Sequence, residues 1–348
     1  MGNKRDVTIY DIANELKLSS STVSRALKNH SSISKKTIER VTAKANEMGY
    51  TPNILASSLR NNKTKTIGVL ISRINRPFMA SLISGIEETA QKAGYKVIIT
   101  QSHDSYKDEV NMAQALYNSR VSGIICSLAM ETTDTDHFDQ FVEKGIPLVF
   151  VDRVPKFFDT YRVMIDNYSA AFKATNHLIE MGAKRIAHIG GLKFRNIYKE
   201  RERGYRDALK KHKLAIDENL ILHVKTMSYD EGEKATNKLL GMDNPPDGIF
   251  SSNDTTAVAA IQVAKQRGLR IPDQLKVMGF NNDPISRIID PGLSTISHPA
   301  FEMGKTCSKK ILKHLKHKNK KSITEITFLN TEVIVRGSTK ECNESVPK

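Results

Sequence analysis

The chain has 348 residues, 39% hydrophobic and 26% charged, which is an ordinary composition for two or three compact globular units. It contains no apolar run of about 18 residues, no apolar signal core at the N-terminus, and three widely separated cysteines. These features argue against a membrane span, a secreted protein, a disulfide framework or a zinc knuckle, so we expect a cytoplasmic protein. The formal net charge of +15 is concentrated near the N-terminus, where residues 1–65 hold 12 Lys/Arg and 5 Asp/Glu. Such a basic segment favours a nucleic-acid partner, although lysines that only maintain solubility would give the same total.

Residues 1–51 predict three short helices. Thr8 and Asp11 form a capping-box pattern, while Ser19 and Ser34 can cap the second and third helices, and Gly49 can end the third. Apolar residues recur at helical spacing in each: Ile9, Ile12, Ala13 and Leu16; Val23, Ala26 and Leu27; Ile38, Val41, Ala45 and Met48. A tight turn between the first two helices makes this a helix-turn-helix unit.

The second helix of such a unit enters the major groove of DNA. Small hydroxyl side chains allow a close approach, and Arg25 is long enough to reach guanine or a phosphate. The alternative is a structural three-helix bundle whose Ser and Thr residues are only caps and solvent-facing groups. The candidate DNA-binding residues of this segment are Thr8, Tyr10, Ser20, Ser21, Thr22, Ser24, Arg25 and Asn29.

Residues 52–62 carry an apolar stripe that includes Ile54, Leu55, Ala56 and Leu59. A helix this short is not stable alone in water, because nucleation is costly. We therefore predict that the stripe is ordered only against a partner. The alternative is a spacer helix that rests on the rest of the protein.

The remaining chain alternates short apolar runs with amphipathic stretches. Strands are predicted at residues 67–71, 97–100, 123–126, 148–151, 162–165, 186–189, 220–224, 248–250, 276–280, 293–297 and 328–335. Helices lie between most of them, including residues 78–93 and 301–315. This pattern predicts parallel sheets covered on both faces, divided into two α/β lobes with a ligand cleft between them.

Polar and aromatic residues that follow the predicted strands are candidates for the walls of this cleft. They are Ser72, Asn75, Phe78, Asp152, Arg153, Asn253 and Asn281. Arg153 adds a charge that could meet a phosphate or a carboxylate. Each could instead be a strand-end cap or a surface residue, and for Arg76 and Asp283 we favour that structural role.

Residues 7–13, 19–27, 49–53 and 336–339 resemble the lactose-repressor (LacI/GalR) family of bacterial transcriptional regulators, and the resemblance runs through the whole chain. It implies a small all-α helix-turn-helix head and a hinge helix, joined to a two-lobed α/β core like a periplasmic binding protein. The implied boundaries are the head at 1–51, the hinge at 52–62, the core at 63–340 and a polar tail at 341–348. Lobe one covers about 64–162 plus 292–322, and lobe two about 163–291 plus 323–340.

The resemblance also implies roles for particular residues. Those matching Ser20 and Ser21 tune the operator sequence, and the one matching Arg25 contacts the operator. Leu59 matches the residue that wedges into the minor groove, with Arg60 beside it. Arg201, Asn253 and Asn281 match residues that hold effector hydroxyl groups, and Phe78 matches one that lines the apolar side. Two departures are Lys17, where the family usually has Gly, and Asn281, which is often Asp.

The resulting expectation is a DNA-binding transcriptional regulator, most simply a repressor, that is not an enzyme and needs no cofactor or metal. Its partners are a palindromic double-stranded operator, a sugar-like effector and a second copy of the chain. A tail without a leucine heptad favours a dimer over a tetramer. The alternatives are a free-standing solute-binding protein, a regulator with a purine or phosphoprotein co-effector, and an α/β enzyme with a DNA-binding head.

Overall fold

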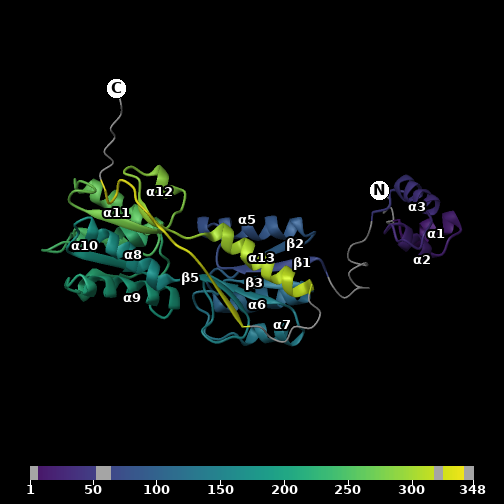
Figure 1. The fold of residues 1–348 in the computed structure, drawn as a ribbon, viewed down its shortest axis with the longest axis horizontal. Coiled ribbons are helices and arrows are strands. Elements are labelled where there is room, and N and C mark those ends of the chain that lie inside the picture. Colours follow the sequence, from purple (N-terminus) through teal and green to yellow (C-terminus); the bar gives the residue numbers. More distant parts are fainter. Residues whose placement is uncertain (1–6, 52–63, 317–323, 341–348) are drawn as a thin grey trace, which may run out of the picture. The chain divides into compact units, whose positions relative to one another are not determined.

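The computed structural model describes residues 7–51, 64–316 and 324–340, and the chain divides into two compact units between residues 63 and 64 (Figure 1). The hinge helix expected at 52–62, with Leu59 and Arg60, and the tail at 341–348 lie outside the described residues. Within the described ranges, no helix combines the length and apolar character needed to cross a membrane.

The first unit contains the three predicted helices, α1 (Ile9–Leu16), α2 (Ser20–Ala26) and α3 (Lys35–Glu47). Each begins at the expected N-cap, namely Thr8, Ser19 and Ser34, whose side chains accept from backbone amides of the first turn. The capping box at Thr8 is complete, and Gly49 follows α3 with a φ of 68°. The apolar faces of all three helices form one small core.

The turn between α1 and α2 depends on Lys17. This residue is left-handed, with φ 51° and ψ 43°, and its amide donates to the Ala13 and Asn14 carbonyls. From α3, Arg40 donates through Nη2 to the Leu16 carbonyl at 3.0 Å, so a cation satisfies the C-terminal end of α1.

The second unit is built on two sheets of six strands. The order of the first is β11 (Glu325–Leu329), β5 (Tyr161–Ile165), β4 (Leu148–Val151), β3 (Gly123–Cys126), β1 (Thr66–Ile71) and β2 (Lys96–Gln101). The order of the second is β12 (Val333–Ile334), β10 (Ser294–Ser297), β9 (Lys276–Asn281), β8 (Gly248–Ser251), β6 (Ile186–Gly190) and β7 (Ile221–His223). The pairing of β10 with β12 is antiparallel, and the other pairings are parallel. The predicted pair of parallel α/β lobes is therefore confirmed.

Helices accompany each sheet. Those of the first lobe are α5 (Pro77–Lys92), α6 (Tyr106–Asn118), α7 (Asp139–Glu143) and α13 (Ala300–Lys316), with a short 3₁₀ helix at Asp136–Phe138. Those of the second are α8 (Asn167–Glu180), α9 (Asn196–Lys211), α10 (Tyr229–Leu240), α11 (Asp254–Gln266) and α12 (Ile285–Ile288), with a 3₁₀ helix at Glu218–Leu220. Because helices cover both faces, every residue of β3, β4 and β8 is buried.

The two lobes repeat one local arrangement. In each, a strand is followed by five residues, then by a helix of 16 residues whose ninth residue is glycine, Gly85 in α5 and Gly204 in α9. A Cβ on Gly85 would lie 2.1 Å from the Phe301 carbonyl oxygen, and one on Gly204 would lie 2.3 Å from the Tyr168 carbonyl oxygen. The glycines therefore allow α13 to pack closely on α5, as Figure 1 shows, and α8 on α9.

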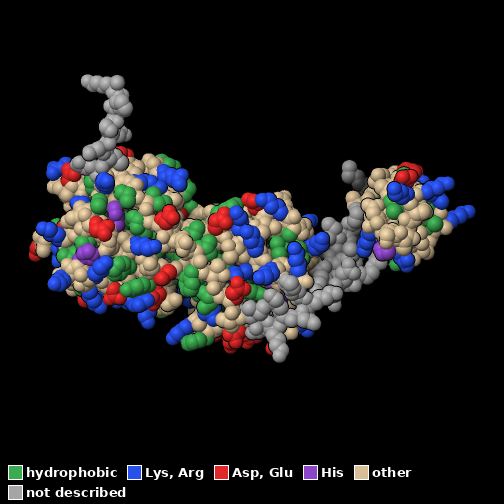
Figure 2. Space-filling view, viewed as in Figure 1, with side chains coloured by type: hydrophobic (Ala, Val, Ile, Leu, Met, Phe, Trp, Pro, Cys, Tyr) green, Lys and Arg blue, Asp and Glu red, His purple; other side chains and the backbone are tan. Residues whose placement is uncertain are grey.

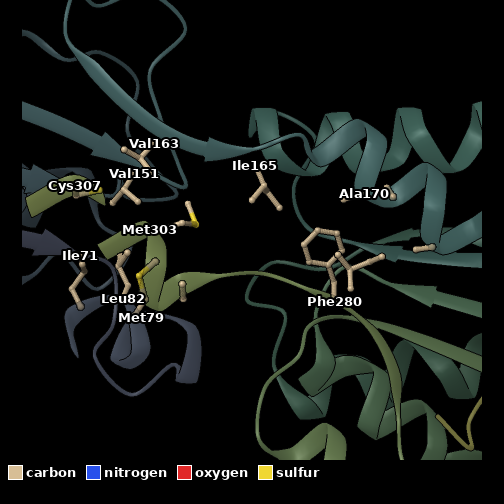
Figure 3. Close-up of a cluster of buried hydrophobic side chains, with 14 of the residues drawn as sticks. Ile71, Met79, Leu82, Val151, Val163, Ile165, Ala170, Phe280, Met303 and Cys307 are labelled. Atoms are coloured by element: carbon tan, nitrogen blue, oxygen red, sulfur yellow. The ribbon is translucent and has the colours of Figure 1, made fainter. Parts of the chain in front are cut away.

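The chain crosses between the lobes three times, and the crossings correct the expected boundaries. The strand at Ser294–Ser297 belongs to the second sheet, not to lobe one, and the strand at Glu325–Leu329 belongs to the first sheet, not to lobe two. The single strand predicted over residues 328–335 is wrong, because the chain leaves the first sheet after Leu329 and enters the second at Val333. A buried cluster accompanies the crossings: Val151, Val163 and Met303 lie on the side of the first lobe, and Phe280 and Ala170 on that of the second (Figure 3).

Two carboxyl groups meet where β9, β10 and α11 join. Asp254 accepts from the Asp283 amide at 2.7 Å and from the Thr295 hydroxyl at 2.6 Å. Burial raises the pKa of Asp254 to about 6. Burial, together with the charge of Asp254, raises the pKa of Asp283 to about 7.

Replacing Lys17 by Gly should stabilise the first unit by about 1 kcal/mol, because a left-handed Lys carries a steric cost that Gly avoids. Scanning calorimetry of the full chain would measure the shift in the transition of this unit. The matched control Lys44→Gly removes a lysine from the interior of α3 and should destabilise the unit by about 1 kcal/mol. Equal effects of the two substitutions would contradict the role given to the turn.

The carboxyl pair should make the stability of the second unit depend on pH. Folding raises both pKa values above 3.8, so the pair contributes stability at low pH that is lost as the pH rises through about 6 and 7. Asp283→Asn is neutral at every pH. The free energy of unfolding of Asp283→Asn, relative to that of the wild type, should therefore increase with pH between 3.8 and about 7, by at most about 1.4 kcal/mol per pH unit. Urea unfolding between pH 4 and 8 measures this difference, with the exposed Asp243→Asn as control; a difference that does not change with pH would refute the assignment.

Candidate functional site

The candidate DNA-binding residues of the first unit form two groups with different surroundings. In the first, hydroxyl groups bond to one another: the Ser19 Oγ lies 2.8 Å from both the Ser21 Oγ and the Thr22 Oγ1. Ser20 and Ser24 are half-buried beside them. The Thr8 hydroxyl donates to Asp11 at 2.7 Å, so the capping box already uses one of its hydrogen bonds.

The second group is open to solvent. Tyr10 is 65% exposed, Arg25 is exposed, and Asn29 is exposed with a left-handed φ of 50°. Arg25 has no carboxylate within salt-bridge distance in the part of the chain that the structure describes. Lys and Arg side chains stand on the visible surface of this unit (Figure 2). A free guanidinium group next to small hydroxyl groups on one short helix can approach both a phosphate and a base edge.

In the second unit, a cavity of about 100 Å³ lies between the two lobes. Side chains from the ends of β1 and β4 line one side, and side chains from α9 and from the ends of β8 and β9 line the other. Seven of the eight predicted effector residues line it: Ser72, Phe78, Asp152, Arg153, Arg201, Asn253 and Asn281. The eighth, Asn75, is exposed and does not line this cavity.

Arg201 is only 4% exposed and is held on three sides. Its Nε donates to the Asn167 Oδ1 at 2.8 Å, its Nη1 donates to the Ser252 carbonyl at 2.7 Å, and its guanidinium carbon lies 3.6 Å from the Phe280 ring centroid. Burial lowers its pKa to about 10, so the group remains charged at neutral pH. No acceptor for Nη2 occurs among the described residues, which leaves this nitrogen able to bind a ligand.

The two asparagines on the second lobe differ in the hydrogen bonds that their side chains make within the protein. Asn253 is the N-cap of α11; its amide oxygen accepts from Thr256 and its amide nitrogen donates to the Met227 carbonyl at 2.8 Å. It therefore fixes the start of the helix as well as the cavity wall. Asn281 has a φ of 119°, and its Oδ1 lies 3.3 Å from the His298 Nδ1.

On the first lobe, Arg153 is tied to a neighbouring carboxylate. It forms an ion pair with Asp104 and donates to the Leu128 carbonyl at 3.3 Å, while its buried Nε has no partner among the described residues. Burial opposes ionisation of Asp104, but the charge and hydrogen bond of Arg153 outweigh it and lower the pKa of that carboxyl. Asp152, with no such partner, has its pKa raised by burial.

An aromatic wall closes one side of the cavity. The Phe78 and His298 ring centroids are 4.2 Å apart, and His298 is 7% exposed. Burial, together with the charge of Arg201, holds the pKa of His298 well below its ordinary value, so the imidazole is neutral. Its Nε2 is buried without a hydrogen-bond partner in the described part of the chain, and the Asp152 Oδ1 lies 3.9 Å away.

Several lining residues were not expected from the sequence. Arg76 and Asp283, for which the sequence favours a structural role, both line the cavity, as do Asp104, Tyr198 and Met227. The sequence signal for Arg76 is a residue spacing that occurs in both lobes. Arg76 and Arg195 are each the fifth residue after a strand and the N-cap of the following helix. Asp104 follows β2 by three residues and gave no comparable signal.

These two arginines connect the lobes. Arg76 of the first lobe donates to the Thr226 carbonyl of the second at 3.1 Å. Arg195 of the second donates to the Met130 and Thr132 carbonyls of the first, at 2.6 and 2.7 Å. In the described conformation, an N-cap arginine of each lobe is therefore hydrogen-bonded to backbone carbonyls of the other lobe.

Comparison with known proteins agrees with both units. Residues 8–53 match the family model described as bacterial regulatory proteins, lacI family, and residues 175–339 match that of a periplasmic binding protein-like domain. The chain is 32% identical to the HTH-type transcriptional regulator DegA of Bacillus subtilis (strain 168), over 97% of this chain and 99% of DegA.

Two solved structures resemble the fold over nearly the whole chain. One is the transcriptional regulator CelR in complex with cellobiose, with a TM-score of 0.71 and 25% identity over 95% of this chain and 99% of that one. The other is the lac repressor dimer bound to operator and the anti-inducer ONPF, with a TM-score of 0.85 and 22% identity over 96% and 99%. The helix-turn-helix head, the two-lobed core and the identity with DegA lead to one conclusion: this chain belongs to the LacI family of DNA-binding transcriptional regulators.

Proposed function

We propose that this protein is a repressor that binds a palindromic double-stranded operator as a homodimer and is controlled by a small sugar-like effector bound between its lobes. The observation that carries the proposal is the interlobe cavity, where guanidinium, amide and hydroxyl groups face an aromatic wall in a chain that also has a helix-turn-helix head. The cellobiose complex of CelR supports a sugar as the effector class.

The effector is bound by groups that suit vicinal hydroxyls. The fixed fork of Arg201 donates, and the amide of Asn281 both donates and accepts. The Phe78 ring faces the apolar side of a sugar ring. Asn281, where the family often has Asp, makes the acceptor at this position neutral.

Effector binding acts through the equilibrium between lobe positions. A ligand shifts such an equilibrium only by its difference in affinity for the two states, and couplings of this kind typically amount to about 1–3 kcal/mol. The reciprocal contacts of Arg76 and Arg195 belong to one of those states.

On the DNA side, Arg25 contacts the operator while Ser20 and Ser21 tune its sequence. Two heads related by a twofold axis read half-sites about one helical turn apart, and the lac repressor dimer on its operator supports this arrangement. Leu59 and Arg60 remain predictions for the minor groove. In a bacterium this activity belongs to the cytoplasm, where the DNA is.

Arg25→Ala should weaken operator binding by about 1–3 kcal/mol, which is roughly 5- to 150-fold, because it removes a direct contact. Ser20→Ala or Ser21→Ala should instead change which operator is preferred. Operators selected from random duplexes, followed by fluorescence anisotropy at fixed salt, would measure both effects. A uniform loss on every sequence for all three variants would overturn the role given to α2.

Arg201→Ala should abolish the effector response and leave operator binding measurable, because the substitution removes the buried donor fork without touching the head. Operator anisotropy titrated with effectors found in a sugar screen gives the readout. The matched control is Arg203→Ala, which removes an arginine on the exposed face of the same helix that pairs with Glu200. If Arg201→Ala titrates like the wild type, the proposed effector site is incorrect.

A further inference from the structure

The interlobe cavity has an unusual balance of charges. Four cationic side chains line it, Arg76, Arg153, Arg201 and Lys225, against three carboxyl groups, Asp104, Asp152 and Asp283. A neutral sugar needs hydrogen-bond donors and acceptors but no net charge from its site. The surplus of positive charge over carboxyl groups therefore bears on the charge of the ligand.

Most of these cations are not neutralised by the protein. Arg153 pairs with Asp104, but Arg76, Arg201 and Lys225 have no carboxylate within 4.0 Å among the residues described. Arg76 and Arg201 bond only to neutral groups, a backbone carbonyl in the first case and an amide and a carbonyl in the second. Arg201 is buried and Arg76 half-buried, whereas Lys225 is exposed to solvent. A buried charge without a counter-charge is costly to the folded protein, and a ligand of opposite charge removes that cost.

The carboxyl groups offset less charge than their number suggests. Burial raises the pKa of Asp152, and burial with the charge of Asp254 raises the pKa of Asp283 to about 7. Burial lowers the pKa of Arg201, and the charge of Arg153 lowers it further, although Tyr198 and Asp152 act in the opposite direction. Burial and the charge of Arg153 also lower the pKa of Arg195. The charge of Arg153 thus disfavours the charged forms of both neighbouring guanidinium groups.

The N-terminal ends of α5 and α9 add partial positive charge to the cavity. The first turns of α5 and α9 contribute Phe78, Met79, Ile197 and Tyr198 to the lining, and neither helix has a side-chain cap. The free amides at helix N-termini carry partial positive charge and bind anions well. Both helices are 16 residues long.

Two buried polar atoms of lining residues also lack hydrogen-bond partners in the described ranges. They are the Arg153 Nε and the Ser252 Oγ, and Ser252 is only 1% exposed. Buried polar atoms are almost always hydrogen-bonded in native proteins. A guanidinium N–H and a hydroxyl are donors suited to an oxyanion.

We propose that the effector of this protein carries an oxyanion, a phosphate ester or a carboxylate, which the arginines around the cavity and the first turns of α5 and α9 bind. This inference rests on the proposed function, because it names the chemical class of the ligand at the same site. The sugar ring or other polar body of the effector occupies the wall formed by Phe78 and Asn281, and the anionic group is what distinguishes it from a neutral sugar.

Inorganic phosphate tests the anion subsite directly on the full chain. At constant ionic strength, replacing chloride by phosphate should raise the Tm of the second unit in proportion to ln(1 + [phosphate]/Kd), by roughly 3 °C at ten times the Kd. Arg153→Gln and Arg76→Gln should lose this logarithmic increase, whereas Arg270→Gln, which removes an exposed arginine of the same unit, should keep it. Phosphate also stabilises proteins non-specifically, but that effect is the same in all variants.

An equal increase in the wild type and all three variants would overturn the proposal. If Arg153→Gln does not fold, Arg76→Gln decides, because Arg76 is only half-buried and makes one backbone hydrogen bond. Calorimetric titrations with glucose, glucose 6-phosphate and gluconate, with Arg153→Gln in parallel, separate the two kinds of anion by which one binds more tightly than glucose.

The proposed function and this inference fail in different ways. A protein that selects no operator from random duplexes would contradict the regulatory function itself. A protein that selects an operator and releases or tightens it with a neutral sugar, while phosphate raises the Tm of the wild type, Arg153→Gln and Arg76→Gln equally, would contradict only the anionic effector.

Discussion

The interlobe cavity depends on one guanidinium group that is nearly withdrawn from water and still charged. Arg201 is held by the Asn167 side chain, the Ser252 carbonyl and the Phe280 ring, which come from α8, from the residue after β8 and from β9. Because an unsatisfied buried charge is strongly destabilising, these elements must keep their positions relative to α9. A ligand therefore meets a donor fork that is already oriented, and less of its binding energy is spent on ordering the site.

The same local sequence pattern occurs in both lobes. In each lobe a strand is followed by five residues, the last of which is an N-cap arginine, and then by a helix with glycine at its ninth position. The arginine and glycine are Arg76 and Gly85 in the first lobe, and Arg195 and Gly204 in the second. The glycine lets a second helix pack against the first, and the arginine reaches the opposite lobe. Packing within a lobe and contact between lobes are thus encoded in one short segment.

Local signals predicted what local physics determines. Ser19 and Ser34 cap helices where their sequence positions indicated, and the buried strands follow short apolar runs. Strand ends also led to most of the cavity wall, since parallel strands present their carboxyl ends on one side. Asn75 lies outside the cavity wall, since a turn residue can point to solvent. Arg76 has no local signature because its partner, the Thr226 carbonyl, lies 150 residues away. The division of residues 328–335 between two sheets is likewise a tertiary event without a local signature.

The three crossings of the chain between the lobes have a mechanical consequence. They follow Ile165, Ser297 and Leu329, so the lobes are joined by three short covalent straps rather than by one linker. A single connection would let one lobe rotate freely, whereas three connections restrict twisting and sliding and leave bending across them as the soft motion. Whatever free energy a ligand supplies on entering the cavity is then directed into one angular coordinate, and little is lost to rearrangements that have no effect on the rest of the protein.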